Sequence, residues 1–335
     1  MVNNFAKKIG EGFKDKNKLT TQVSRYLMKE TKSDRRTDCI HPSEMAKENW
    51  CPRSTFYQIA GYPTDPIPRS LMMEMVFETG HDAHRKWQQW FREMGVLEGL
   101  WRCLACGNTW DAVSPDICPA CDAPAYLINY EEVPIFNDEY LIAGKADGIV
   151  HRPDGSKTLI EIKTIGVGTV RWDAPNLVYA NTFSHKDEDG KLHQGIDWQG
   201  VWNNIRRPFN AHLRQGMIYC LSSGINEITF IYDPKFLTAH PKEFLVKFNP
   251  EVIEESLEKC LIVKSSLEKN RPPKRPMWAE PDNKTCKACA FKKECYERRT
   301  ERDNLPKTDV GKDGFEEAKP VAPKKARIRF TETSS

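Results

Sequence analysis

The sequence predicts an α/β fold in which a central mixed sheet is flanked by helices. Three stretches point to it: two alternating segments around a tight turn between 139 and 165, a Met-, Phe- and Trp-rich amphipathic helix over 71–94, and an alternating strand over 225–232. At 335 residues the chain can bury a sizeable core. Hydrophobic residues make up 39% of the chain and charged residues 29%, as in soluble globular proteins.

The N-terminal part of the chain is basic. Residues 1–38 read as a loose arm with one helical stretch around 20–31, and residues 1–36 hold ten Lys and Arg against four Asp and Glu. Residues 269–299 repeat that ratio. Local basic excess of this kind suits a phosphate-rich partner, although an ordinary solvated surface can have the same composition. A helix over 43–61, with Ser43 as its N-cap, and the amphipathic helix of 71–94 follow the arm.

Residues 101–127 form a short segment with two cysteine pairs. Cys103 and Cys106 make the first pair, Cys118 and Cys121 make the second, and eleven residues separate the pairs. Four thiolates at this spacing can close a tetrahedral zinc site. The segment is too short for a core of its own, so zinc would supply its folding energy, and four thiolates leave no open position for catalysis. We therefore expect a structural zinc-binding insertion.

The hairpin over 139–165 carries the candidate chemistry. Glu161 and Lys163 are two residues apart and project from one face of their strand, while Asp147 lies near them across the hairpin. Two carboxylates and a lysine can hold Mg²⁺ or Mn²⁺ and activate a water for attack on a phosphodiester. The spacing alone is weak, because many solvated hairpins match it.

The turn of this hairpin sets which residues face one another. A two-residue loop at Asp154 and Gly155 would place Asp147 opposite Ile162, on the wrong face for a shared metal. The metal site therefore requires an odd-length loop or a bulge between 147 and 161.

The remaining stretches complete the fold and end in a tail. Residues 166–208 have no clear period and many polar residues, so we interpret them as a long loop or insertion over the site. A helix over 209–222 stops at Gly224, strands cover 225–232 and 243–248, and a helix covers 250–267. Residues 301–335 are charged, contain Pro and Gly, and predict a disordered tail.

A second cysteine set, Cys286, Cys289 and Cys295, lies near the end of the ordered region and needs a fourth ligand. The upstream candidates are Cys39, Cys51, Cys220 and Cys260. Four thiolates hold either zinc or an iron–sulfur cluster, and spacing does not separate the two.

Taken together, these elements resemble the RecB-like branch of the PD-(D/E)xK nucleases, and within it the iron–sulfur exonucleases associated with CRISPR systems and phages. The resemblance covers about residues 40–300, and its elements occur in the order of that family: Cys51-Pro52-Arg53, Gly80 with His84, Gly144 with Asp147 and Glu161 with Lys163, Gln215 with Tyr219, and the Cys286, Cys289 and Cys295 triplet. The zinc-like insertion, the 166–208 segment and the charged tail depart from the simplest members.

The resemblance implies a restriction-endonuclease-like core over 39–300 and a role for each matched residue. His84, Asp147, Glu161 and the Ile162 carbonyl would hold Mg²⁺ or Mn²⁺, and Lys163 would help to activate the water. Cys51 would close a [4Fe–4S] cluster with the triplet, so that the 271–299 segment pins the two ends of the domain together. Gln215 and Tyr219 share a helix face and would touch a base, a phosphate or Lys163.

Several other residues have simpler interpretations. His81 reads as a helix-surface histidine, and Cys39, Cys220 and Cys260 as small buried residues. Trp87, Trp90 and Phe91 read as core, although an aromatic side chain near the site could stack on a base. Glu131 and Glu132 precede the first core strand, and one of them is a further candidate for the metal shell.

The function that we expect is metal-dependent DNA exonuclease activity on single-stranded or frayed ends, in phage or bacterial DNA recombination, repair or processing. The alternatives are a non-catalytic DNA-binding or capture subunit of a larger complex, and an endonuclease. The chain has no apolar run long enough to span a membrane and no secretory signal, so we expect a cytoplasmic protein, in the host cytoplasm if it is phage-encoded. Candidate protein partners are recombination or replication proteins, contacted through the 301–335 tail.

Overall fold

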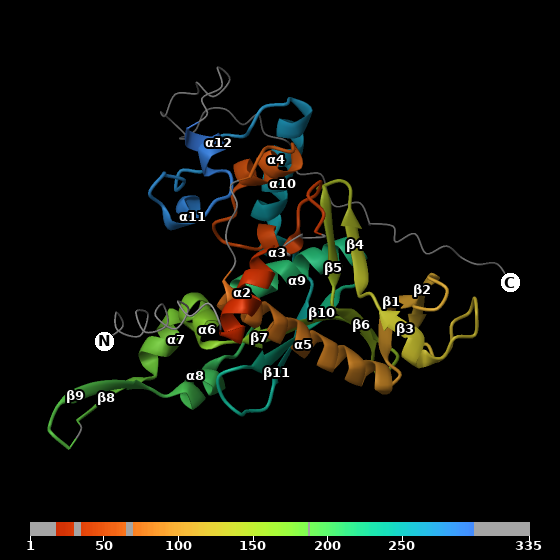
Figure 1. The fold of residues 1–335 in the computed structure, drawn as a ribbon, viewed down its shortest axis with the longest axis horizontal. Helices are drawn as coiled ribbons and strands as arrows, with labels where there is room; N and C mark the ends of the chain where they lie inside the picture. The colour runs from red at the N-terminus through yellow and green to blue at the C-terminus, as the bar shows by residue number, and fades with distance from the viewer. Residues whose placement is uncertain (1–17, 30–34, 65–69, 187, 298–335) are drawn as a thin grey trace.

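A seven-stranded mixed sheet forms the centre of the protein (Figure 1). The computed structural model describes residues 18–29, 35–64, 70–186 and 188–297. The strands run in the order β11-β10-β7-β6-β1-β2, and β3 pairs with β1. β7 and β10 are parallel and every other pair is antiparallel, which confirms the predicted mixed α/β architecture. The bounds are β1 Leu97–Cys103, β2 Thr109–Val113, β3 Ile128–Tyr130, β6 Gly148–His151, β7 Lys157–Ile165, β10 Glu227–Pro234 and β11 Lys242–Lys247.

Two helices place hydrophobic cores against this sheet. The long helix α5, Leu71–Glu93, contributes Trp87 and Phe91 to one core, and α9, Asn210–Ser223, contributes Met217 and Ile218 to another. Both match the sequence expectation closely. α9 ends where predicted, because Gly224 adopts a left-handed conformation with φ 75°.

The first of the two segments expected in the 139–165 hairpin is in fact two strands, which corrects the prediction. β5, Ile142–Ala146, pairs with β4, Val133–Asn137, in a separate two-stranded sheet, whereas β6 joins the central sheet. Asp147 is the single residue between them. The expectation of an odd-length loop is confirmed: the Arg152 amide donates to the Ser156 carbonyl at 2.9 Å, which leaves a three-residue turn that Gly155 completes with φ 82°.

The cysteine-bearing segment expected over 101–127 begins within a strand of the central sheet. Its first strand, β1, pairs with β6 at one end and with β2 and β3 at the other. Cys103 and Cys118 are both buried in the same hydrophobic cluster as Leu97 and Ile128. The segment is therefore an extension of the central sheet and shares its core.

The prediction of a single helix over 43–61 is also wrong. The structure has two short helices, α3 Pro42–Met45 and α4 Pro52–Ile59, because Pro52 cannot donate the hydrogen bond of a helix interior and instead begins a new helix. Pro42 occupies the first turn of α3, so the N-cap is His41 and not Ser43.

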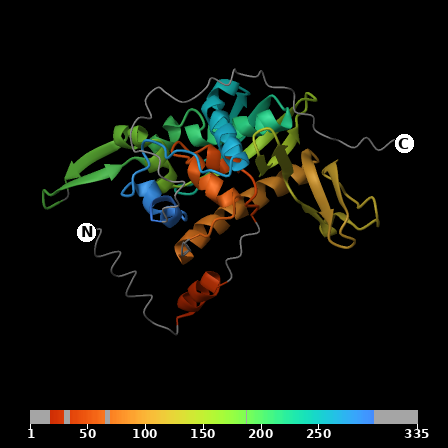
Figure 2. The same cartoon turned by 90° about the horizontal axis from the view of Figure 1, so that it is seen from above.

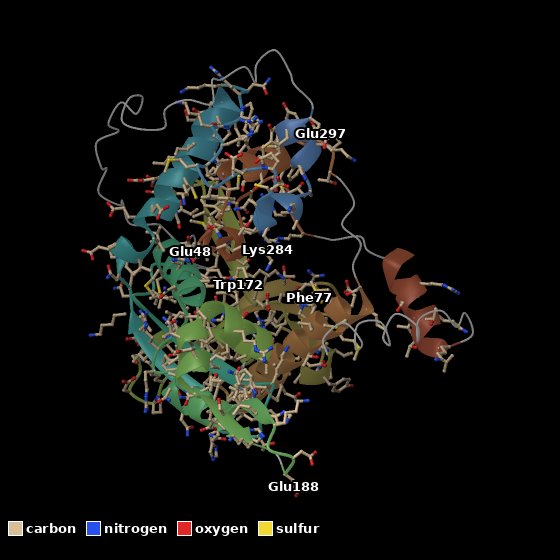
Figure 3. The ribbon with its side chains drawn as sticks, turned by 90° about the vertical axis from the view of Figure 1, so that its left-hand side faces the viewer. Glu48, Phe77, Trp172, Glu188, Lys284 and Glu297 are labelled. Carbon is tan, nitrogen blue, oxygen red and sulfur yellow. The ribbon has the colours of Figure 1, made fainter. Side chains whose placement is uncertain are left out.

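The 166–208 segment is regular structure, and the expectation of a loop is wrong. Each of its elements is too short to show a period in the sequence. The hairpin of β8 and β9 extends away from the body (Figure 1), and Glu188 lies at its tip (Figure 3). The elements are α6 Val167–Asp173, α7 Pro175–Ala180, β8 Thr182–Lys186, β9 Leu192–Ile196 and α8 Trp198–Asn204.

The last helices lie beside α4, on one side of the central sheet (Figure 1). Phe56 and Tyr57 of α4 form a hydrophobic cluster with Phe291. The buried Arg53 donates to the Pro273 carbonyl at 2.8 Å, which joins positions 220 residues apart. The helices are α10 Glu254–Glu268, preceded by a 3-10 turn at Pro250–Val252, α11 Lys284–Lys287 and α12 Lys292–Tyr296.

One helix of the N-terminal arm, α2 Leu19–Lys29, is described and agrees with the helical stretch expected around 20–31 (Figure 2). The expected 301–335 tail and the first 17 residues lie outside the described residues. Among the helices that the structure describes, none is long and apolar enough to cross a membrane.

Candidate functional site

Asp147 lies where the chain passes from the small sheet to the central sheet. The register of β4 and β5 brings Asp147 level with Glu132, and the register of β6 and β7 brings it level with Glu161. Its Oδ2 accepts a hydrogen bond from the Ile162 amide at 2.6 Å, and the residue is 7% exposed. Two ladders therefore deliver three carboxylates to one place.

Glu161 is buried and only half satisfied. Its Oε1 lies 2.5 Å from Lys163 Nζ, whereas its Oε2 is buried with no hydrogen-bond partner among the described residues. Burial raises the pKa of Glu161 to about 7, because it outweighs the opposing charge of Lys163. A buried carboxylate oxygen without a partner is costly, and a divalent cation is a natural partner for it. The residues present therefore fit Mg²⁺ or Mn²⁺ beside Asp147.

Helix α9 supplies a second hydrogen-bond partner for Lys163. Lys163 Nζ donates to Gln215 Oε1 at 3.2 Å, and Gln215 Nε2 donates to the Tyr219 hydroxyl at 2.9 Å. Burial alone would lower the pKa of Lys163. The negative charges of Glu161 and Asp147 outweigh burial, so the pKa of Lys163 is raised. The sequence left a base, a phosphate and Lys163 as partners for Gln215 and Tyr219. Of these, the structure shows Lys163, and Gln215 and Tyr219 are both buried.

His84 reaches the site from α5. Its Nδ1 lies 3.2 Å from Asp147 Oδ1, and ligand atoms of His84, Glu132 and Asp147 all lie within 4.8 Å of one another. In the part of the chain that the structure describes, Glu161 is not a member of this close group. Burial disfavours the imidazolium, but the hydrogen bond with Asp147 and the negative charges of Asp147 and Glu161 together outweigh it and raise the His84 pKa.

A cleft of about 250 Å³ opens beside His84. It carries both signs of charge, since basic residues of α5 and β5 face acidic residues that follow β3. Its lining residues are His81, His84, Arg85, Gln88, Tyr130, Glu131, Glu132 and Lys145. His81 lies at the surface as expected, with its side chain 65% exposed. Trp90, expected in the core, is instead 46% exposed.

Two polar residues near the site were missed from the sequence. Gln88, one turn after His84, donates to the Asp147 carbonyl at 3.0 Å. His212 precedes Gln215 by three residues, and its Nδ1 lies 2.6 Å from the Tyr232 hydroxyl. The same hydroxyl accepts a hydrogen bond from the Phe209 amide at 2.7 Å. Both residues continue helix faces that carry predicted site residues, which was the available signal.

The four sulfurs of the first cysteine set lie within 4.8 Å of one another, close enough to hold a metal ion. Cys103 and Cys121 have their sulfurs 3.7 Å apart, as do Cys106 and Cys118. A tetrahedron with zinc–sulfur bonds of about 2.3 Å has edges of roughly 3.8 Å. The backbone N–H of Cys106 contributes most to lowering the pKa of Cys103 to about 7, which favours the ligating thiolate.

The second cysteine set comes together across the N- and C-terminal parts of the chain. Burial raises the pKa of the Cys289 thiol, and its neighbours Cys51, Cys295 and Cys286 raise it further by their charge. In the described part of the chain these four do not form a group within 4.8 Å, unlike the first set. Thiolates that bind different irons of one cluster are spaced more widely than thiolates that share one ion.

The sulfurs of this second set already accept hydrogen bonds. Arg275 Nε donates to Cys295 Sγ at 3.3 Å, the Phe291 amide to Cys289 Sγ at 3.4 Å, and the Tyr296 hydroxyl to Cys286 Sγ at 3.5 Å. Hydrogen bonds of this kind stabilise thiolate ligands. Cys39, Cys220 and Cys260 are buried, as expected of residues that fill a core.

No protein-family model and no curated protein matches the chain. Among solved structures it is similar to the alkaline exonuclease LHK-Exo from Laribacter hongkongensis, with 12% identity over 70% of this chain and 90% of that chain and a TM-score of 0.38. LHK-Exo in complex with dAMP gives 11% identity over the same shares and a TM-score of 0.36. SSO0001 gives 14% identity over 85% of this chain and 99% of that chain and a TM-score of 0.35.

Proposed function

We propose that this protein is a metal-dependent DNA exonuclease. The observation that carries the proposal is Glu161, a buried carboxylate with one oxygen on Lys163 and the other without a partner among the described residues, level with Asp147. This is the arrangement that a phosphodiester hydrolase needs at a divalent cation. The part of the proposal that cleavage starts from DNA ends is based on the sequence resemblance.

Each residue of the site has a chemical task in this proposal. Asp147, Glu161, the Ile162 carbonyl and His84 would hold Mg²⁺ or Mn²⁺, which stabilises negative charge on the phosphate when it is bound. Lys163, held between Glu161 and Gln215, donates a hydrogen bond to the attacking water or to a phosphate oxygen.

The cysteine sets have structural tasks in the same proposal. Cys103, Cys106, Cys118 and Cys121 would hold zinc at the end of the central sheet, and Cys51, Cys286, Cys289 and Cys295 would hold a [4Fe–4S] cluster. Anaerobically purified protein should then contain about four irons and one zinc per chain. Two zinc ions and no iron would overturn the cluster and leave the carboxylate site standing.

The substrate that we propose is single-stranded or frayed DNA, met in the cytoplasm during recombination, repair or processing. Arg85 and Lys145 beside the cleft offer positive charge to a phosphate backbone. Recombination or replication proteins remain the proposed partners of the 301–335 tail.

An end-labelled DNA assay with Mn²⁺ tests the proposal. The full chain should degrade linear single strands and leave circular single strands intact, and Asp147→Asn should lose this activity but still bind DNA. Cleavage of the circle would identify an endonuclease. Binding of both substrates without cleavage by the wild-type protein would instead identify a DNA-capture subunit.

A further inference from the structure

We infer that Trp172 and Lys284 form a subsite for one nucleotide of single-stranded DNA, in which the base stacks on the indole ring and a phosphate binds the ammonium group. The inference rests on the proposed function, because it adds a substrate contact to that site. Its starting point is a contact between two distant parts of the chain: Lys284 Nζ, of α11, lies 4.6 Å from the centroid of the Trp172 ring, of α6 (Figure 3).

The side chain of Trp172 is unusually open to solvent. It is 69% exposed, the highest value among the nine tryptophans, all of which lie in the described part of the chain. Tryptophan is highly buried on average. Lys284 takes one side of the ring through a cation–π contact, and the high exposure leaves the rest of the ring accessible. An accessible aromatic face is the surface on which a nucleobase stacks.

Helix α6 places this ring close to the carboxylate site. The strand that carries Lys163 ends at Ile165, and α6 begins two residues later, at Val167. Val170 is fully buried in the main core and anchors the helix. At a rise of 1.5 Å per residue, Trp172 lies about 8 Å along the axis from the first residue of α6. A base on this ring therefore belongs to the same short stretch of strand as a phosphate beside Lys163.

Helix α5 brings a second exposed aromatic side chain to the same end of β7. The Lys235 amide donates to the Ile165 carbonyl at 2.8 Å, and Lys235 Nζ donates to the Val76 carbonyl at 3.3 Å. Phe77, the next residue of α5, is 44% exposed. It precedes His84 by seven residues, so the two side chains share one face of the helix. The approach to the site from this side is therefore aromatic.

The charge of Lys284 is available to a phosphate. A second pair of the same kind exists, because Lys86 Nζ lies 5.4 Å from the Trp90 ring, but Lys86 also forms an ion pair with Asp233 at 2.5 Å. Lys284 forms no ion pair with any residue that the structure describes. It also belongs to the basic 269–299 segment. Of the two pairs, the one at Trp172 thus offers both a ring and an uncompensated positive charge.

This combination selects single strands. A base in a duplex is stacked on its neighbours and is not free to stack on a protein ring without being turned out of the helix, which costs free energy. A base in a single strand can stack on the ring at little cost, and any of the four bases can do so. The subsite therefore recognises an unpaired nucleotide and not a particular sequence.

The first experiment is a binding titration of the full chain with labelled single strands and duplexes, without added Mn²⁺ so that no cleavage occurs. Trp172→Ala should weaken single-strand binding by about tenfold and leave duplex binding unchanged, and Trp172→Phe should retain most of the affinity. Trp90→Ala is the matched control, since it removes the other exposed tryptophan beside a lysine, and it should bind like the wild type.

The second experiment identifies the stacked base. Single strands that carry one abasic nucleotide, placed at each position in turn, should include one that binds the wild type about tenfold more weakly. The same strand should bind Trp172→Ala no more weakly than the intact strand does. Lys284→Gln should reduce the slope of log affinity against log salt by about 0.7, the value for one phosphate of a single strand.

The outcomes separate the subsite from the proposed function. Single-strand binding by Trp172→Ala at the wild-type level, an equal loss on duplexes, or an abasic effect that persists in Trp172→Ala would each overturn the inference. The expected binding effects in a wild-type protein that does not cleave DNA with Mn²⁺ would support the subsite and overturn only the hydrolysis. A wild-type protein that binds no DNA would overturn both.

Discussion

Lys163 and Glu161 form an ion pair of 2.5 Å on one face of β7, and their side chains are 22% and 2% exposed. Both side chains are largely shielded from water, so the ion pair holds the lysine in one orientation more firmly than a surface ion pair would. Each of the two charges is stabilised by the other. A substitution of Lys163 is therefore the most direct test of the site.

Lys163→Ala should lower the cleavage rate by about 100-fold or more, because it removes a donor that stabilises the transition state. DNA binding and the folded state should be largely retained. Single-turnover cleavage and DNA-binding titrations measure the two effects separately. Lys157→Ala is the matched control on the same strand, since Lys157 is 47% exposed and pairs with Glu98 away from the site. Near-normal cleavage by Lys163→Ala would show that the site is wrongly assigned.

Tyr219→Phe tests the support behind the lysine. The change removes the hydroxyl that accepts from Gln215 Nε2, so the amide loses the partner that fixes which of its ends faces Lys163. We expect kcat to fall by about tenfold, the cost of roughly 1.4 kcal/mol of lost positioning, with Mn²⁺ affinity unchanged. Tyr179→Phe, at a residue 84% exposed, is the control and should have no effect. A loss of Mn²⁺ binding in Tyr219→Phe would contradict a role through the lysine alone.

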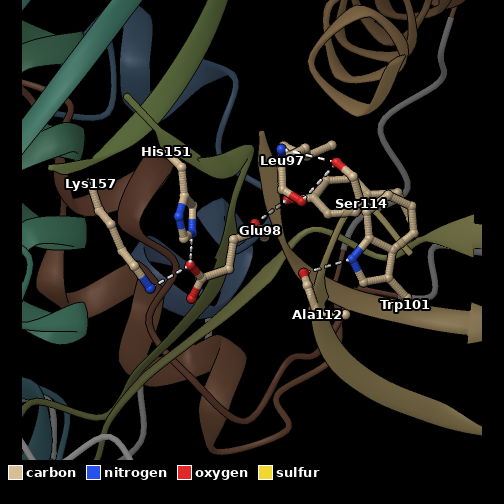
Figure 4. A network of polar contacts seen from close by, with 8 residues as sticks. Leu97, Glu98, Trp101, Ala112, Ser114, His151 and Lys157 are labelled. Atoms are coloured by element: carbon tan, nitrogen blue, oxygen red, sulfur yellow. Dashed lines mark hydrogen bonds and ion pairs between the residues drawn. The ribbon is translucent and has the colours of Figure 1, made fainter. Parts of the chain in front are cut away.

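Glu98 makes the stability of the sheet depend on pH (Figure 4). Burial raises its pKa, but hydrogen bonds from Lys157, at 2.6 Å, and His151 outweigh burial and hold the pKa below its ordinary value. A carboxylate with a depressed pKa stabilises the fold above its unfolded pKa, and that stabilisation is lost as pH falls through the folded pKa.

The wild type should therefore exceed Glu98→Gln in free energy of unfolding by about 1 kcal/mol at neutral pH. The difference should shrink below a pH of about 4, where the carboxyl group becomes protonated. Urea unfolding at several pH values measures it. Glu243→Gln removes an exposed carboxylate of β11 and should show no such trend. A difference that stays constant into acid would rule out the ion pairs as its source.

Cys118→Ser should lose zinc and destabilise a region that extends beyond the cysteine segment. Cys118 is fully buried in the core beneath the sheet, and Arg92 of α5 donates to the carbonyls of Ile128, at 2.9 Å, and Ala125, at 2.6 Å. Hydrogen exchange should therefore rise in β1 and at the C-terminal end of α5, alongside a zinc content near zero. Cys260→Ser changes an equally buried cysteine in another cluster and should keep its zinc. Unchanged exchange in β1 would show that the segment folds independently.

The residues that the sequence placed correctly belong to long elements with a clear period. The ends of α5 and α9 follow from their apolar faces and from Gly224, and the odd-length turn follows from requiring Asp147 to lie level with Glu161. These depend on local chemistry and on strand register, both of which are written in the sequence.

What could not be predicted depends on tertiary context. Glu132 was only one of two candidates, because a glutamate in a left-handed conformation runs against its propensity and is held there by Leu100 of another strand. The contact of His212 with the Tyr232 hydroxyl joins α9 to β10, twenty residues later in the chain, and no local pattern reveals it. The break at Asp147 lies between Ala146 and Gly148, which are weak strand formers. The sequence does not show, however, that the two halves pair with different neighbours, because that pairing is set by β4 and β7.

The contact of Arg53 with the Pro273 carbonyl has a consequence for how the chain is made. Translation delivers Asp147, Glu161 and Lys163 long before the segment that covers α4, so a ribosome-bound chain holds its chemical residues while Phe56 and Tyr57 still lack Phe291. Such a nascent chain is open on one side and exposed to proteases and aggregation. Completion of the segment that carries Pro273 and Phe291 closes the molecule, and a fragment that ends before it retains the carboxylates but lacks the layer that covers α4.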